Sequence, residues 1–309
     1  TSFEQVKQAY DRQMGYWCDK MAAVLNAVDY AQQRVKPLPF LSTVMDGCVE
    51  QGVDVSAGGA KRNFIGTECV GVGTVADGLS AIKQLVFDEK KVTGAQLLQA
   101  IRDNWEGHET LYAYVNSDKV HHYGNDDDYA DELTAFGLDT YFDHIEGRGT
   151  LHGGVYTPGV YCSVGNVDFG GKQWASVDGR KAGEPLAEGG ISPHQGRNVC
   201  GVTSTFKSVA KLPTEQITGG VLLNQKMTPS MLSSEQNKQK LELLISAFFN
   251  RLHGYHVQYN IVSRETLLDA QQHPENYKDL IVRVAGYSAF FNVLSKATQD
   301  DIIGRTEQT

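Results

Sequence analysis

The sequence predicts an α/β fold, on three observations. Apolar residues recur at steps of three and four in several long stretches, as on the buried face of a helix. The segment from His256 to Val262 alternates apolar and polar residues with period two, which is typical of a strand. Stretches of both kinds follow one another along the chain, separated by glycine and proline. Because no internal repeat, low-complexity linker or domain boundary is visible, we expect mixed α/β architecture over 1–309 as one body.

The first half of the chain reads mainly as helix. Nine apolar residues predict one face of a long N-terminal helix that ends before Pro37 and Pro39: Phe3, Val6, Tyr10, Met14, Trp17, Met21, Val24, Leu25 and Val28. Further helices are expected over 75–83 and 94–105. Another should begin near Asn125, where a run of acids suits the positive end of a helix dipole. Glycine and proline are dense over 147–201, so short strands and ordered loops are expected there.

The last seventy residues alternate between the two kinds of element. An apolar stripe from Leu241 to Leu252 predicts a helix that stops at Gly254. After the predicted strand at 256–262, Ser263 is placed to cap a short helix, and Pro274 to open another. The apolar run 281–291 contains a single glycine, Gly286, and Ser295 precedes a final helix.

Charge and composition exclude several classes of function. Lys and Arg total 28 against 37 Asp and Glu, a net charge of −9, and no basic stripe is interleaved with aromatics. We therefore expect no nucleic-acid partner. No apolar run approaches the roughly eighteen residues of a membrane span, and no signal peptide opens the chain. The five cysteines lack C-x-x-C or zinc-finger spacing, which predicts reduced thiols in a cytoplasmic protein and no metal site.

The segment Arg283-Val-Ala-Gly-Tyr-Ser-Ala-Phe-Phe carries the most specific chemical signal. Because glycine has no Cβ, its α-carbon can become planar without steric cost. A radical there is delocalised between an electron-donating amide nitrogen and an electron-withdrawing carbonyl. Burial by Val284, Tyr287, Phe290 and Phe291 would exclude oxygen and water. On these residues alone, a glycine that permits close packing or a tight turn is the alternative.

Arg283-Val-Ala-Gly-Tyr-Ser-Ala resembles the fingerprint of the glycyl radical enzymes. Six further segments resemble the C-terminal region of that family: Gly58-Gly-Ala, Tyr123-Gly-Asn-Asp-Asp-Asp-Tyr, Asp178-Gly-Arg-Lys-Ala-Gly-Glu-Pro-Leu, Asn224-Gln-Lys, Asn260-Ile-Val-Ser-Arg-Glu-Thr-Leu-Leu-Asp-Ala-Gln and Ile302-Ile-Gly-Arg-Thr-Glu. The resemblance covers essentially the whole chain. Pyruvate formate-lyase carries Ser-Gly-Tyr-Ala at this site, whereas Ala285-Gly-Tyr-Ser is more similar to the eliminase branch.

The resemblance implies a fold and an activity. The fold is the C-terminal part of a ten-stranded α/β barrel, in which this chain supplies the later half-sheet and the glycyl radical loop, with 263–309 as the glycyl radical domain. The activity is that of a lyase, a formate C-acetyltransferase-like enzyme that dehydrates a small polar substrate such as a diol or hydroxyproline. Gly286 is the implied catalytic residue. Carbon–carbon cleavage and decarboxylation are alternative chemistries of the same family.

The resemblance also implies how the radical is made. No cofactor is bound; a separate radical-SAM activating enzyme, with S-adenosylmethionine and a 4Fe-4S cluster of its own, takes one hydrogen atom from Gly286. The product is an oxygen-sensitive organic radical, so the enzyme is expected to be anaerobic and cytoplasmic. A homodimer is expected as well.

Family members also need a cysteine that becomes a thiyl radical, on a loop that typically reads Gly-Cys-Val-Glu. Gly47-Cys48-Val49-Glu50 has this pattern. However, the residues after Glu50 resemble a downstream family segment, and the interval to Gly286 is short. We interpret Cys48 as a structural thiol. Since the chain begins at Thr1 rather than Met, a radical-bearing fragment or split-enzyme subunit without the thiyl cysteine is a third hypothesis.

Weaker signals are interpreted as structural. Gly71-Val-Gly-Thr-Val-Ala resembles a dinucleotide-binding turn but lacks the acidic residue that would follow it. The acids at 126–128 are expected to be a solvated helix start. The adjacent His121 and His122 should diverge, and His253 and His256 are expected to be ordinary polar residues beside a strand. Two departures from the family pattern could lie near the substrate cavity: Arg62, and Asn198-Val-Cys-Gly-Val.

Overall fold

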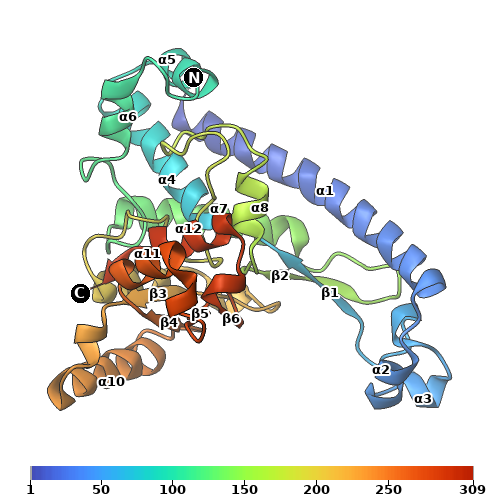
Figure 1. The fold of residues 1–309 in the computed structure, drawn as a ribbon. Coiled ribbons are helices and arrows are strands. Elements are labelled where there is room, and N and C mark those ends of the chain that lie inside the picture. Colours follow the sequence, from blue (N-terminus) through green and yellow to red (C-terminus); the bar gives the residue numbers. More distant parts are fainter. Residues whose placement is uncertain (1, 309) are drawn as a thin grey trace. The chain divides into compact units, whose positions relative to one another are not determined.

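The computed structural model describes residues 2–308, which fall into two compact units (Figure 1). Unit 1 holds the residues up to Thr67, together with Asp139–Gly159 and Gln216–Gly219. Unit 2 holds Glu68–Leu138, Val160–Glu215 and the chain from Gly220 onward. The units interleave along the chain, so no single linker separates them. For this reason the sequence showed no domain boundary.

Unit 1 is built on one long helix. Helix α1 (Phe3–Val35) begins at a capping box, in which Ser2 and Gln5 exchange hydrogen bonds between side chain and backbone. The other elements of the unit are α2 (Pro39–Val44), α3 (Cys48–Gln51), the 3₁₀ turn η1 (Val55–Ala57), and the paired strands β1 (Phe64–Glu68) and β2 (Val155–Gly159). The predicted N-terminal helix is confirmed, and it ends just before Pro37.

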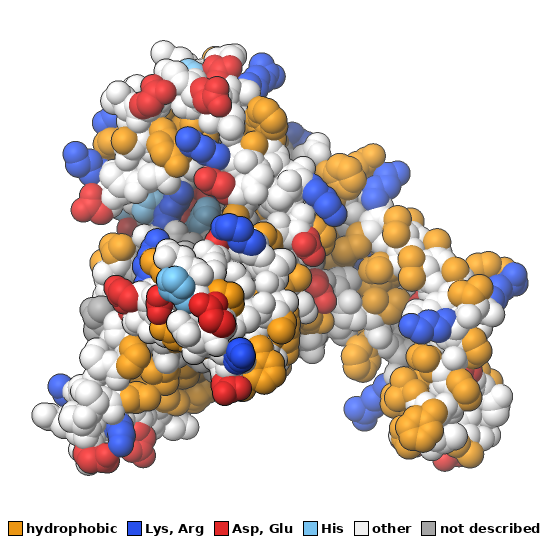
Figure 2. Space-filling model, viewed as in Figure 1, with side chains coloured by type: hydrophobic (Ala, Val, Ile, Leu, Met, Phe, Trp, Pro, Cys, Tyr) orange, Lys and Arg blue, Asp and Glu red, His pale blue; other side chains and the backbone are white. Residues whose placement is uncertain are grey.

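The apolar face predicted for α1 is only partly buried: six of its nine residues are half-buried and three are exposed. Cys18 is the only buried residue of the helix, whereas Trp17 keeps 63% and Val24 61% of its surface exposed. Hydrophobic side chains lie open over α1 and over the end of the unit that carries α2 and α3 (Figure 2). Helical periodicity predicted the element correctly, but among the described residues its apolar face is covered only in part.

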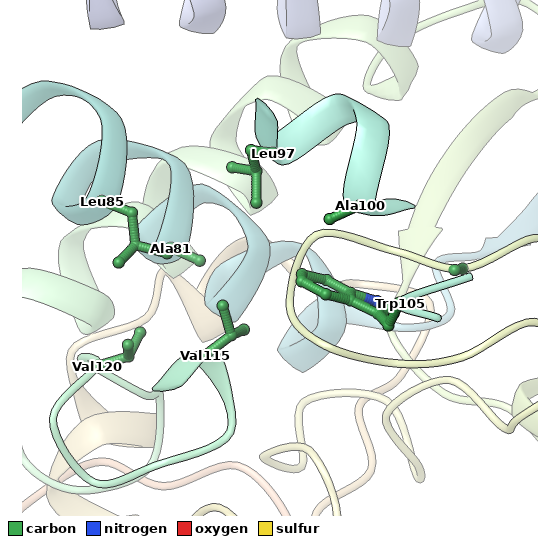
Figure 3. Packing of buried hydrophobic residues seen from close by; sticks show 8 residues of the cluster. Ala81, Leu85, Leu97, Ala100, Trp105, Val115 and Val120 are labelled. Carbon is green, nitrogen blue, oxygen red and sulfur yellow. The ribbon is translucent and has the colours of Figure 1, made fainter. Parts of the chain in front are cut away.

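The first part of unit 2 contains an apolar cluster. Helix α4 (Val72–Ile82) continues into a π-turn, η2 (Lys83–Asp88), and is followed by α5 (Gly94–Arg102) and α6 (Glu109–Val115). These elements enclose eight buried residues: Ala81, Leu85, Leu97, Ala100, Trp105, Val115, Val120 and Ala175 (Figure 3). The helices predicted at 75–83 and 94–105 are therefore confirmed, with an earlier start for the first and an earlier end, at Arg102, for the second. Helix α7 (Asp128–Ile145) begins in unit 2 and ends in unit 1.

The glycine-rich stretch of unit 2 is mostly ordered loop, as predicted. Between Val160 and Gly201 it contains one short helix, α8 (Gly165–Gly170). Helix α9 (Val202–Ala210) and the 3₁₀ turn η3 (Thr214–Gln216) follow.

The C-terminal part of unit 2 is a small parallel sheet beside a hairpin. The sheet has the order β4-β3-β7, from β3 (Asn224–Met227), β4 (Gln258–Ile261) and β7 (Glu307–Gln308). In its register Asn224 faces Gln258 and Lys226 faces Asn260. Strands β5 (Ile281–Arg283) and β6 (Ser288–Phe290) form an antiparallel hairpin. Among residues 2–308 the largest sheet has three strands, so this part of the chain does not by itself form a five-stranded half-sheet.

Helices connect these strands. They are α10 (Glu235–Asn250) after the turn η4 (Pro229–Leu232), α11 (Arg264–Gln272), and α12 (Lys296–Gly304), with the 3₁₀ turns η5 (Pro274–Asn276) and η6 (Phe291–Val293). The hydroxyls of Ser263 and Ser295 accept the backbone N–H three residues on, which confirms both predicted caps. None of the helices in the described part of the chain is long and apolar enough to cross a membrane.

Candidate functional site

Gly286 lies at the tip of the β5–β6 hairpin. Its φ is +78°, in the left-handed region that favours glycine, and Val284 N donates to Tyr287 O across the turn at 2.9 Å. A Cβ added to Gly286 would meet only Leu222 Cδ1, at an ordinary contact distance of 3.6 Å. The tight-turn interpretation is therefore confirmed, and the close-packing interpretation is not supported.

The tip of the hairpin is open in this chain. Gly286 is exposed, and Tyr287 and Phe290 keep 40% and 46% of their surfaces exposed. Val284 and Phe291, by contrast, are buried in a second apolar core with α11 and α12. The prediction that four apolar side chains cover Gly286 is wrong for Tyr287 and Phe290. The buried pair anchors the base of the hairpin, while the exposed pair lies toward its open side.

Two side chains hold the peptide groups on either side of the Gly286 α-carbon. The N–H of Gly286 donates to Gln258 Oε1 at 3.2 Å. The carbonyl oxygen of Gly286 accepts from Arg283 Nη2, also at 3.2 Å. Arg283 Nε donates to the same Gln258 Oε1 at 3.0 Å, so the two side chains contact each other as well as the glycine.

Asn260 fixes the end of strand β5. Its Nδ2 donates to Arg283 O at 2.6 Å, and its Oδ1 accepts from Arg283 N at 2.7 Å. The amide thus satisfies both backbone groups of Arg283, as a neighbouring strand would. The backbone of Arg283 is held independently of its guanidinium.

Asn224 connects the hairpin to a buried carboxylate. Its Nδ2 donates to Glu188 Oε2 and, at 3.4 Å, to Val284 O, and its Oδ1 accepts from Gln258 Nε2. Asn224, Gln258 and Asn260 form what we call the amide lattice. All three side chains are buried. Burial raises the pKa of the Glu188 carboxyl, an effect that Arg305 opposes.

Arg305 supports the hairpin from the C-terminal side. Its Nη1 donates to Val284 O at 2.9 Å, and its Nη2 pairs with Asp301 Oδ2 at 3.0 Å. Glu188 Oε2 lies 3.8 Å from its Nε. Burial alone would lower the pKa of the guanidinium, but Glu188 and Asp301 outweigh it, so the pKa is raised and the charge is kept. This buried cation therefore contacts two carboxylates and the backbone carbonyl of Val284.

The cavity beside Arg305 has a volume of about 10 Å³, the size of roughly one water. It is lined by Glu188, Pro193, Gln195, Asn198, Asn224, Gln225, Lys226, Arg305 and Thr306. It is too small for an organic substrate. Asn198, in the segment that departs from the family pattern, lies here. Arg62, the other departure, is exposed in unit 1.

Two family models match the chain. Residues 1–170 match the model described as pyruvate formate lyase-like, and residues 187–292 match the model described as glycine radical. The second match contains Gly286 and the amide lattice. The chain belongs to the glycyl radical enzymes.

Individual relatives agree with this assignment. The chain is 45% identical to (2S)-3-sulfopropanediol dehydratase from Klebsiella oxytoca, over 99% of this chain and 37% of the relative. It is 42% identical to trans-4-hydroxy-L-proline dehydratase from Clostridioides difficile, over 100% and 38%. The glycerol-bound, B12-independent glycerol dehydratase from Clostridium butyricum superposes with a TM-score of 0.95 at 40% identity, over 100% and 39%. The chain thus spans less than two fifths of each of these relatives.

These similarities confirm the predicted family and an α/β fold that corresponds to a part of the family barrel, and the three relatives named here are dehydratases. The limits of the radical domain at 263–309 stay a prediction. So does the assignment of the radical to Gly286.

In this glycyl radical enzyme Cys48 does not have the environment of a reactive thiol. Its side chain is buried, with 2% of its surface exposed, at the start of α3. Burial and two nearby carboxylates raise the pKa of the thiol, which disfavours the thiolate. Glu50 accepts a hydrogen bond from Gly47 N at 3.1 Å and so serves as a local cap. The buried position of Cys48 agrees with its interpretation as a structural thiol, and its lack of a catalytic role stays a prediction.

The acids at 126–128 are more than a solvated helix start. Asp126 pairs with Lys207 at 2.8 Å and Lys211 at 2.9 Å, which connects the start of α7 to α9. His121 and His122 diverge as predicted: His121 Nδ1 lies 2.5 Å from Asp127, whereas His122 turns toward the buried Asp77. Among residues 2–308 no group of three or more His, Cys, Asp or Glu residues could hold a metal ion.

Two other interpretations can be placed in the structure. Gly73, within the dinucleotide-like segment, packs closely against the 186–194 loop, because an added Cβ would lie 2.9 Å from His194 N and Ser192 O. His256 accepts a hydrogen bond from Leu223 N at 3.3 Å, and burial lowers its pKa. His253 lies three residues beyond the end of α10 and has a positive φ of 56°.

Proposed function

We propose that this chain is the radical-storing part of a glycyl radical dehydratase, with the radical on Gly286. The observation that carries the proposal is the hairpin tip. A glycine that needs no packing partner stands at the tip, where the buried Gln258 accepts from its N–H and the half-buried Arg283 donates to its carbonyl oxygen. The small-molecule substrate is proposed to be a diol or a hydroxyproline, because relatives at 45% and 42% identity are named for dehydration of such compounds.

Activation requires an external oxidant for one C–H bond. A radical-SAM enzyme supplies one electron from its reduced 4Fe-4S cluster, and S-adenosylmethionine then gives methionine and a 5′-deoxyadenosyl radical. That radical takes the α-hydrogen atom of Gly286, which leaves 5′-deoxyadenosine and a glycyl radical.

Turnover then depends on a thiyl cysteine. In the proposed sequence Gly286 accepts a hydrogen atom from that thiol at the start of a cycle and returns it at the end. We propose that the cysteine and its partner base are not Cys48 and Glu50, since the first is buried and the second caps α3. We also propose that the enzyme is a homodimer in an anaerobic cytoplasm. Its glycyl radical domain is proposed to span 263–309.

The test is anaerobic activation of the longest polypeptide that carries this sequence. Treatment with the activating enzyme, S-adenosylmethionine and reductant should give a doublet in the electron paramagnetic resonance (EPR) spectrum. Gly286→Ala should remove the doublet, because a methyl group is strained at φ +78° and crowds the planar centre. Gly304→Ala is the matched control, since an added Cβ at Gly304 meets nothing within 4 Å.

A full doublet in Gly286→Ala would refute the assignment. The activated protein is then offered 1,2-diols and hydroxyproline under anaerobic conditions. Dehydration of either supports the proposed activity. A doublet without any turnover would identify a subunit that only stores the radical, and carbon–carbon cleavage or decarboxylation would place it with other chemistries of the family.

A further inference from the structure

We propose that Gln258 and Arg283 are positioning residues that stabilise the glycyl radical by polarising the two peptide groups beside Gly286. The inference rests on the proposed radical at Gly286 and assigns a role to its neighbours. Gln258 Oε1 accepts from the N–H, and the Arg283 guanidinium donates to the carbonyl. Both bonds are 3.2 Å long, and both end on the residue whose α-carbon would carry the spin.

The two hydrogen bonds act in the same electronic direction. A radical between an amide nitrogen and a carbonyl is stabilised when the nitrogen releases electron density and the carbonyl withdraws it. An acceptor on the N–H makes the nitrogen a better donor, and a cation on the carbonyl oxygen makes that group a better acceptor. Hydrogen bonds to a charged group are roughly twice as strong as neutral ones, so Arg283 supplies the larger effect.

The orientation of the Gln258 amide is fixed by its neighbours. The carbonyl of Val284 can only accept, so Asn224 must present Nδ2 to it, and its Oδ1 then faces Gln258. Gln258 Nε2 therefore donates to Asn224 Oδ1, and Gln258 Oε1 is left to accept from the Gly286 N–H. The buried amide lattice therefore determines that Gln258 presents a hydrogen-bond acceptor to the N–H of Gly286.

A structural role alone does not account for the Arg283 side chain. Asn260 already satisfies the backbone of Arg283, and Val284 and Phe291 already bury the base of the hairpin. The guanidinium is half-buried and directs its three nitrogens to Gln258, Ser288 and the Gly286 carbonyl. The guanidinium therefore contacts the Gly286 carbonyl and does not form part of the apolar core.

The experiment compares activated variants by EPR and by thermal unfolding. Gln258→Leu removes the acceptor and Arg283→Gln removes the cation. The matched controls are Gln271→Leu, whose amide contacts Gln299 and Asp300 on α12, and Arg264→Gln, whose exposed side chain lies outside the hairpin. The readouts are the anaerobic half-life of the doublet, its splitting by the remaining α-hydrogen, and the midpoint of unfolding.

In Arg283→Gln the doublet should decay about tenfold faster, the effect of one charge-assisted hydrogen bond, and in Gln258→Leu, which loses a neutral hydrogen bond, the acceleration should be smaller. The splitting should widen, because less spin is delocalised away from the α-carbon. Arg283→Lys, which keeps a cation, should decay at an intermediate rate. The controls should match the wild type in both properties. A change in splitting cannot come from lower stability alone, so it separates the proposed role from a structural one.

Wild-type half-life and splitting in both Gln258→Leu and Arg283→Gln would overturn the inference while leaving the radical at Gly286 intact. If Gln258→Leu does not fold, Arg283→Gln decides the question, because its side chain is only half-buried. Absence of any doublet in the wild-type protein contradicts the proposed function instead. The two failures are therefore distinguishable.

Discussion

Unit 2 stabilises two of its regions in opposite ways. The apolar cluster formed by α4, α5, α6 and their neighbours consists of aliphatic side chains and Trp105, which pack by shape and not by directional bonds (Figure 3). The hairpin that carries Gly286 stands on buried amides and on an arginine between two carboxylates. The first region gains stability from area removed from water, which depends on volume and little on orientation.

In the second region, hydrogen bonds fix the orientation of the groups instead. Each bond in the amide lattice has a donor, an acceptor and a direction, and a partner left alone in the interior costs its full desolvation energy. We therefore expect the apolar cluster to tolerate substitutions that conserve volume. The amide lattice should tolerate neither the loss of a hydrogen-bonding side chain nor its replacement by one of different shape. If Gly286 carries a radical, as proposed, its peptide groups need the fixed orientation that directional hydrogen bonds provide.

The largest expected difference between the two regions is their response to oxygen after activation. Oxygen adds to a carbon-centred radical, and the peroxyl product breaks the backbone there. Air should therefore cleave activated protein at Gly286 and release a piece from Tyr287 to the C-terminus, while the apolar cluster stays intact. Mass spectrometry of activated and unactivated samples checks this. Cleavage at another residue, or equal cleavage without activation, would contradict a radical at Gly286.

Replacing the buried cation should have the next largest effect. Arg305→Met leaves Glu188 and Asp301 without a counter-charge and removes the donor to Val284 O. The expected loss is about 3–5 kcal/mol in the free energy of unfolding. Chemical denaturation measures it. Arg305→Lys should recover little of the loss, because an ammonium cannot reproduce the planar fork that contacts all three groups.

The apolar cluster should respond differently to a pair of substitutions of the same kind, one that removes a side chain and one that conserves most of it. Leu85→Ala deletes a fully buried side chain and should cost about 2–5 kcal/mol, depending on how far the cavity collapses. Leu85→Met should cost less than about 1.5 kcal/mol, since it nearly conserves volume. Equal losses in Leu85→Met and Arg305→Lys would show that the two regions are not stabilised in different ways.

The sequence predicted the features that depend on near neighbours. Ser263 and Ser295 were recognised as caps because the groups they bond lie three residues away, and Gly286 was recognised from the residues beside it. The amide lattice was missed, since its members Asn224 and Gln258 lie 34 residues apart. Its one visible signal is that Gln258 and Asn260 are polar at alternate positions of a predicted strand. The cover over Gly286 was predicted wrongly because composition does not say which side of a hairpin each aromatic faces.

A smaller effect concerns the helix that positions Arg305. Ser295 Oγ accepts from Thr298 N at 3.3 Å at the start of α12, whose last turn leads into Arg305. Ser295→Ala should lower the free energy of unfolding by about 1 kcal/mol, the usual cost of losing an N-cap. Ser233→Ala removes an exposed hydroxyl that caps no helix start and should change it by less than about 0.5 kcal/mol.

The smallest expected effect on chemistry is at Cys48. Its thiol is buried, its pKa is raised, and the neighbouring Glu50 is engaged at the start of α3. Cys48→Ser should therefore leave turnover of the complete enzyme unchanged, while Gly286→Ala abolishes it. Native alkylation checks the environment independently, since a thiol with 2% exposure should react far more slowly than the exposed Cys200. A loss of turnover by several orders of magnitude in Cys48→Ser, together with fast alkylation, would instead make Cys48 the thiyl cysteine.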